Sequence, residues 1–104
     1  MLLRRPASAP DYPEEELERI QRAHLAYYAG LREAGHVVTN GPVEGPPDPS
    51  LRGLAFYRTG SVERSGQLAA ADPAVLAGRL AMEIMTWYCS PGTMSGPGRS
   101  VTLP

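Results

Sequence analysis

A histidine lies on the apolar face of the first predicted helix, where a polar ring needs a partner. Residues 14–34 carry apolar and aromatic side chains at steps of three and four, a spacing that places them on one helix face with His24. The members of this stripe are Leu17, Ile20, His24, Tyr27 or Tyr28, and Leu31. An unpaired polar group buried there costs about 1–3 kcal/mol. The best candidate partner is Asp72, in Ala71-Asp72-Pro73.

A histidine and an aspartate in contact could carry out proton transfer. The carboxylate favours the charged imidazole and fixes its tautomer, and such a ring can take a proton from a phenol or an activated carbon and return it elsewhere. No serine stands in a nucleophile motif, so a hydrolytic triad is not supported. Another interpretation stays open, because His24 could be a satisfied core residue and Asp72 a turn residue before Pro73.

Composition excludes several classes of function. The chain has 104 residues, which predicts one domain, and its 42% hydrophobic and 20% charged residues are typical of a soluble globular protein. A net charge of −1 gives no strong field for nucleic acid or for a membrane surface. All ten basic residues are arginine, which excludes a lysine Schiff base, covalently bound pyridoxal phosphate and a P-loop lysine. We expect no organic cofactor.

Disulfide, metal and membrane features are not predicted. Cys89 is the only cysteine, so no internal disulfide or cysteine-rich metal cluster can form. The spacing of His24, His36 and any carboxylate matches no zinc motif, and we expect no metal. No apolar run approaches the ~20 residues that cross a bilayer. A proline-rich acidic stretch follows Arg4 and Arg5 where a signal peptide would be apolar, so we expect a cytoplasmic protein.

Turn residues and hydrophobic periodicity divide the chain into alternating elements. The predicted elements are strand 1–5, helix 14–34 between Pro13 and Gly35, strand 36–40, strand 53–59, helix 62–71 capped by Ser61, a helical turn at 74–78 and strand 79–88. This order is that of the α+β, ferredoxin-like split βαβ (βαββαβ) sandwich, with two helices on one face of an antiparallel sheet. The other face would expose Met85 and Trp87, which favours a two-fold homodimer.

An ordered set of short motifs lies between His24 and Trp87. The motifs are His24-Leu25, Asn40-Gly41-Pro42, Gly53-Leu54, Ala71-Asp72-Pro73-Ala74-Val75, Ala77-Gly78-Arg79-Leu80 and Trp87-Tyr88. Together they resemble the YCII-related (YciI-like) family. The resemblance implies a ferredoxin-like subunit in a dimeric α/β-barrel assembly, and an active site of one histidine and one aspartate that maps onto His24 and Asp72. Some members of that family are lyase-like enzymes that eliminate halide from hydroxylated aromatics.

The sequence departs from the family pattern at both ends. Strand one begins almost at Met1, where relatives carry several more apolar residues, and the tail after Cys89 is longer than usual. We interpret residues 1–88 as the ferredoxin-like domain and residues 89–104 as a Pro/Gly-rich tail.

Two main hypotheses of function follow. The first is a cofactor-independent, lyase- or isomerase-like enzyme acting on a compact hydroxylated or aromatic substrate, with His24 as general acid/base and Asp72 as its orienting partner. Arg79 would either form a salt bridge with Asp72 or bind an anionic substrate, and Trp87 would serve the site or pack at an interface. The full set of expected substrate-binding residues is Tyr28, Gly41, Arg79 and Trp87. The second hypothesis is a non-catalytic dimeric module that binds a small ligand or acts as an accessory subunit; a purely structural dimer without a pocket is a third.

Overall fold

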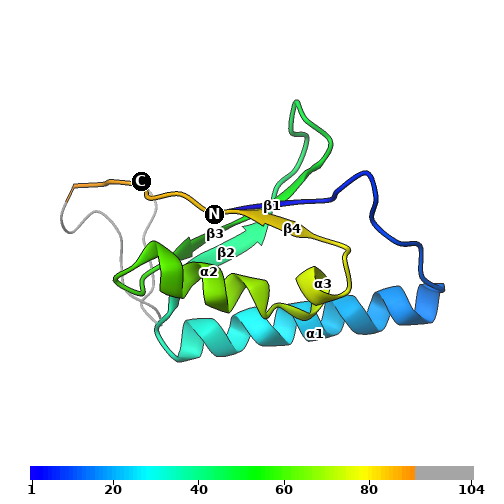
Figure 1. Cartoon of the computed structure of the whole chain (residues 1–104), viewed down its shortest axis with the longest axis horizontal. Coiled ribbons are helices and arrows are strands. Elements are labelled where there is room, and N and C mark those ends of the chain that lie inside the picture. Colours follow the sequence, from blue (N-terminus) through cyan, green and yellow to red (C-terminus); the bar gives the residue numbers. More distant parts are fainter. Residues whose placement is uncertain (91–104) are drawn as a thin grey trace.

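The computed structural model describes residues 1–90. It has a four-stranded antiparallel sheet with the helices on one side (Figure 1). The elements are β1 (Leu2–Arg4), α1 (Glu14–Glu33), β2 (Val37–Pro42), β3 (Leu51–Tyr57), α2 (Val62–Ala70), α3 (Pro73–Leu76) and β4 (Ala81–Glu83). The strand order is β2-β3-β1-β4. This mixed α+β arrangement is compatible with the predicted ferredoxin-like fold. Most of the predicted tail, residues 91–104, lies outside the described residues.

Helix α1 begins and ends as the sequence predicts. Three glutamates in its first turn follow Pro13 and face the positive end of the helix dipole. At the other end, Gly35 has φ +84°, and the N–H of His36 donates to the carbonyl of Leu31 at 2.9 Å. The N–H of Gly35 donates to Arg32 at 3.0 Å, which completes a Schellman motif. The glycine therefore ends the helix and turns the chain into β2.

The apolar stripe of α1 divides into two parts. Its C-terminal part supplies Tyr28 and Leu31 to the core, where they pack with Val37 of β2 and Ala55 of β3. Its N-terminal part, with Leu17 and Ile20, is only partly buried and lines a pocket. The same apolar face of α1 therefore packs in the core at its C-terminal end and lines a pocket at its N-terminal end.

The bounds of all four strands differ from the prediction, β1 least, since it spans Leu2–Arg4 where the sequence predicted 1–5. Strand β4 spans only Ala81–Glu83, where the sequence predicted 79–88. It pairs with β1 along the length of that short strand, with Glu83 opposite Leu2, and residues 84–88 form no strand. Strand β2 continues through Pro42, and β3 begins at Leu51 rather than at residue 53. Pairing between β2 and β3 extends both strands past the glycines that were expected to bound them.

Side-chain caps begin both helices in the second half of the chain. The Ser61 hydroxyl accepts the N–H of Arg64 at 3.1 Å, so the predicted cap of α2 is present. Asp72 caps α3, and Pro73 occupies its first turn, where a missing N–H costs nothing. Helix α3 packs against α1, which brings residue 72 close to the middle of α1. None of the helices within residues 1–90 is long and apolar enough to cross a membrane.

Candidate active site

A hydrogen bond between His24 and Asp72 joins the middle of α1 to the first turn of α3. The distance from His24 Nδ1 to Asp72 Oδ2 is 2.7 Å, although the residues are 48 positions apart in the chain. Both residues are buried: Asp72 is 0% exposed and His24 is 9% exposed. The structure thus brings together the two residues that the sequence analysis singled out.

The two oxygens of Asp72 have different partners. Oδ1 accepts the N–H of Ala74 at 2.9 Å as the cap of α3, and Oδ2 accepts the bond from His24. Because a carboxylate can only accept, Nδ1 of His24 carries the proton, and a neutral ring then has its lone pair on Nε2. No residue among 1–90 hydrogen-bonds to Nε2. Nε2 of this ring therefore keeps a lone pair that can accept a hydrogen bond.

Tyrosines surround the histidine on its core side. The ring centroids of His24 and Tyr28 are 5.2 Å apart, and the hydroxyls of Tyr28 and Tyr57 lie 2.7 Å from each other. Burial raises the pKa of Tyr57 to about 12, and it raises the pKa of Tyr28 further above the ordinary tyrosine range. Both phenols are therefore neutral. Tyr28 packs against the imidazole, and Tyr57 interacts with the hydroxyl of Tyr28.

A pocket of about 840 Å³ opens beside the histidine. It lies between α1, the ends of β1, β2 and β3, and the segment that follows α3. Of the residues expected to bind substrate, Gly41 and Arg79 line this pocket together with His24. Arg79 donates to the carbonyl of Pro10 at 2.9 Å, and no ion pair joins it to Asp72 within the described residues. The expected salt bridge is thus not formed, and the guanidinium lies in the pocket wall.

Tyr28 does not line this pocket, contrary to the expectation that it binds substrate. It is 0% exposed, and its hydroxyl already interacts with Tyr57 and the sulfur of Met1. The reason is helical phase: of the adjacent pair, Tyr28 points directly into the core, while Tyr27 is half-buried and donates to the carbonyl of Leu68 at 2.7 Å. Tyr28 is a core residue that packs against the candidate site.

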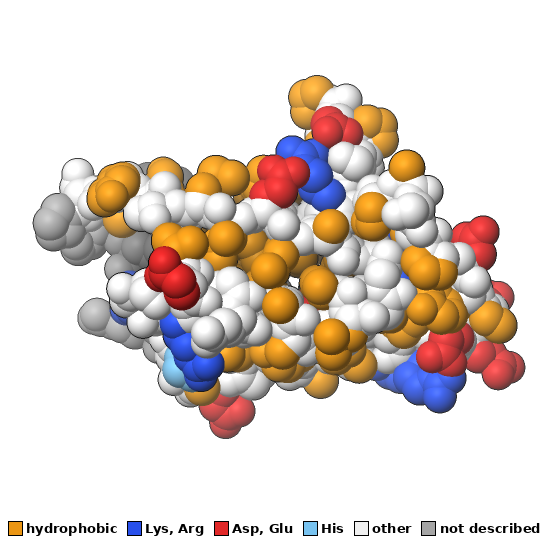
Figure 2. Space-filling model, in the orientation of Figure 1, with side chains coloured by type: hydrophobic (Ala, Val, Ile, Leu, Met, Phe, Trp, Pro, Cys, Tyr) orange, Lys and Arg blue, Asp and Glu red, His pale blue; other side chains and the backbone are white. Residues whose placement is uncertain are grey.

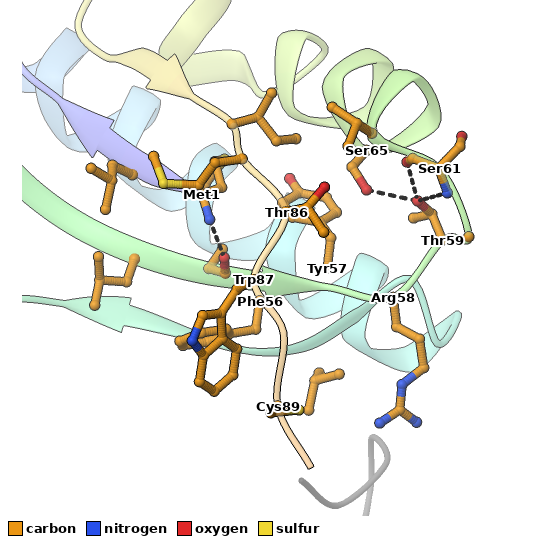
Figure 3. Close-up of a pocket in the computed structure, with 18 residues that line it drawn as sticks. Met1, Phe56, Tyr57, Arg58, Thr59, Ser61, Ser65, Thr86, Trp87 and Cys89 are labelled. Atoms are coloured by element: carbon orange, nitrogen blue, oxygen red, sulfur yellow. Dashed lines mark hydrogen bonds between the residues drawn. The ribbon is translucent and has the colours of Figure 1, made fainter. Parts of the chain in front are cut away.

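Trp87 lies at a second cavity of about 730 Å³, which His24 does not line (Figure 3). Its ring is tilted against Phe56 with centroids 5.2 Å apart, and it is 60% exposed. The hydroxyls of Thr59 and Ser65, 2.6 Å apart, mark another part of this cavity (Figure 3). Trp87 therefore does not line the pocket of His24 in this structure, because the segment after β4 runs to another part of the fold.

Four arginines of the histidine pocket were missed by sequence reasoning. The pocket is lined by Arg5 after β1, by Arg22 and Arg32 of α1, and by Arg52 of β3. Each stands in an ordinary local context, and only the pairing of β1 with β3 places Arg5 near Arg52. No local signal in the sequence identifies them. No group of three or more His, Cys, Asp or Glu side chains suited to a metal occurs in the part of the chain that the structure describes.

Comparison with known proteins gives one finding. No curated protein and no solved structure matches the sequence. The family model described as the YCII-related domain matches residues 2–88. This range begins with β1, ends after β4 and contains both His24 and Asp72. The chain therefore belongs to the YCII-related family.

Proposed function

We propose that this protein is a small-molecule enzyme in which His24 and Asp72 carry out general acid/base proton transfer. The reaction would be a lyase-like elimination or an isomerisation of a compact hydroxylated or aromatic substrate. One observation carries the proposal: a histidine held by a fully buried carboxylate at 2.7 Å also lines a pocket large enough for such a molecule. Catalysis by a positioned imidazole needs this combination of a fixed tautomer and access to the substrate.

Each member of the pair has a separate task. Nε2 of His24 takes a proton from a hydroxyl or an activated carbon, and Asp72 stabilises the imidazolium that results. In an isomerisation the same proton returns to another atom of the substrate. In an elimination the leaving anion departs with its bonding electron pair, and the proton passes to solvent. Neither reaction needs an electron acceptor, which agrees with the expectation of no organic cofactor.

The open side of the sheet supports a further part of the proposal, a homodimer of the dimeric α/β-barrel type. Met85 and Trp87 are more than half exposed, and Figure 2 shows hydrophobic side chains along the stretch after β4. A patch of this kind is usually covered in soluble proteins. We also propose residues 1–88 as the folding unit and a cytoplasmic location, where an exposed lone thiol such as Cys89 would stay reduced.

Replacement of His24 by glutamine tests the catalytic role. A chlorinated, hydroxylated aromatic compound is the first probe, and chloride release is the measurement. We expect His24→Gln to lower turnover by about 10²-fold or more, because a general base contributes about 10²–10⁴-fold. Its melting temperature should stay close to that of the wild type. Full turnover in this variant would contradict the proposal, and collapse of the fold would identify His24 as a core residue.

Asp72→Asn provides the matched second variant. Its amide oxygen can still accept the N–H of Ala74, so the cap of α3 is retained. Its amide nitrogen then donates to Nδ1 of His24, which places the imidazole proton on Nε2 and removes the base. Turnover should fall while the melting temperature changes little, and imidazole ¹⁵N spectra should report the change of tautomer. Binding of the probe without chloride release by the wild type would instead favour the non-catalytic ligand-binding or accessory module.

A further inference from the structure

The histidine pocket carries a positive charge that the chain as a whole does not. Five arginines line it against two glutamates, whereas the net charge of the protein is −1. Three of these arginines come from separate parts of the fold: Arg5 follows β1, Arg52 belongs to β3, and Arg79 follows α3. The fold therefore gathers cations at one site from positions far apart in the sequence.

These three guanidinium groups have no anionic partner among residues 1–90. The buried Nε of Arg5 has no hydrogen-bond partner, and Arg79 donates to a neutral carbonyl, that of Pro10. By contrast, Arg4, one position before Arg5, pairs with the carboxylates of Asp48 and Glu83. Carboxylates are thus available near this end of β1, but they lie against Arg4 and leave the pocket arginines unpaired.

Arg5 lies close enough to Arg52 and Arg79 to feel the charge of both. Burial, and then the charges of Arg79 and Arg52, lower the pKa of Arg5. A buried donor without an acceptor and unbalanced like charges both cost free energy at this site. An oxyanion would relieve both, because guanidinium groups bind carboxylates through paired, charge-assisted hydrogen bonds.

A short corner of the chain links this cluster to the catalytic pair. The carbonyl of Ala74 accepts the backbone N–H groups of Arg79 and Leu80 at 3.0 and 3.2 Å. The N–H of the same residue donates to Asp72, which holds His24. The corner therefore places the backbone of Arg79 at a defined position relative to the imidazole. Apolar side chains of α1, Leu17 and Ile20, form another wall of the same pocket.

We propose that Arg5, Arg52 and Arg79 form a subsite for the carboxylate of a compact organic acid. The apolar body of that acid lies against Leu17 and Ile20, next to His24. The claim that this acid is the substrate rests on the proposed function, because the subsite would orient the acid for proton transfer at Nε2. The claim that the subsite binds a carboxylate does not depend on catalysis, and it can be tested separately.

Binding of benzoate, compared with the neutral isostere benzamide, tests the subsite. Calorimetric titration at fixed low ionic strength should detect benzoate and little or no benzamide. Arg52→Gln and Arg79→Gln should each weaken benzoate binding about tenfold or more, since a hydrogen bond to a charged group contributes about 1.5–3 kcal/mol. Arg64→Gln, which removes an exposed arginine of α2 outside the pocket, is the matched control and should bind as the wild type does.

The outcomes separate this inference from the catalytic proposal. His24→Gln should keep benzoate affinity within about threefold, because the imidazole is not part of the anion subsite. Loss of turnover with retained binding would therefore support both proposals, and binding without turnover in the wild type would leave the subsite standing alone. Equal affinity for benzamide, or unchanged affinity in both Arg52→Gln and Arg79→Gln, would overturn the subsite. Displacement of benzoate by inorganic phosphate at comparable affinity would overturn its assignment to carboxylic acids.

Discussion

At the scale of single residues, the buried tyrosines on the core side of His24 make the stability of the fold sensitive to pH in the alkaline range. The hydroxyls of Tyr28 and Tyr57 are paired, and burial raises both pKa values, that of Tyr57 to about 12. An unfolded tyrosine ionises near pH 10, so above this pH the unfolded chain binds fewer protons than the folded one. The free energy of unfolding should therefore fall as the pH rises from about 10 towards 12.

Urea unfolding between about pH 9 and pH 11 measures this effect. In that range the N-terminal amine, whose pKa is lowered by burial, is already neutral in both states and adds no slope. The double variant Tyr28→Phe/Tyr57→Phe should have a flatter pH profile, whereas the exposed Tyr88→Phe control should keep the wild-type profile. Equal profiles for wild type and double variant would show that these phenols ionise freely in the folded protein.

At the scale of elements, two glycines should respond in opposite ways to the same substitution. Gly30 lies in α1 with open space where a Cβ would stand, so Gly30→Ala should stabilise the protein by up to ~1 kcal/mol through helix propensity. Gly53 lies in β3, where an added Cβ would stand 3.0 Å from the carbonyl oxygen of Gly41. That oxygen belongs to the paired strand β2 and cannot move without disturbing the sheet.

Gly53→Ala should therefore destabilise the protein by about 1–3 kcal/mol, the usual cost of overpacking. Both glycine variants can be compared in the same thermal or urea unfolding experiment. A stabilising Gly53→Ala would mean that β2 and β3 separate more easily than their register implies. Since Gly41 and Gly53 both line the histidine pocket, this variant should also weaken ligand binding there.

At the scale of the whole molecule, the exposed apolar side chains after β4 predict self-association. We expect a dimer in sedimentation equilibrium, and a shift towards monomer when Met85→Ser and Trp87→Ser are combined, because the substitutions remove apolar area from the proposed interface. Leu76→Ser is the matched control, since Leu76 is 74% exposed on α3, among the helices rather than in this patch. A wild-type protein that stays monomeric at every concentration would contradict the dimer.

Local patterns in the sequence were enough to predict most of the helix bounds and one pair of candidate residues. Helical periodicity, Pro13 and Gly35 indicated the bounds of α1, and Ser61 indicated the cap of α2. A histidine on the apolar stripe of α1 pointed to Asp72 as its partner. These features depend on neighbours along the chain, whose conformational preferences a sequence displays directly. The strand bounds were less accurate, because a strand depends on its partner, and β4 pairs with β1 only along the length of that short strand.

Which residues share a pocket with the histidine became clear only from the three-dimensional fold. It placed Tyr28 in the core and Trp87 at another cavity, and it brought Arg5 and Arg52 to the pocket wall. Membership of a pocket depends on strand register and on how helices pack across the sheet, and these couple residues that no local pattern connects. The chemistry of one side chain could therefore be predicted from sequence, whereas the charge that surrounds it required the fold.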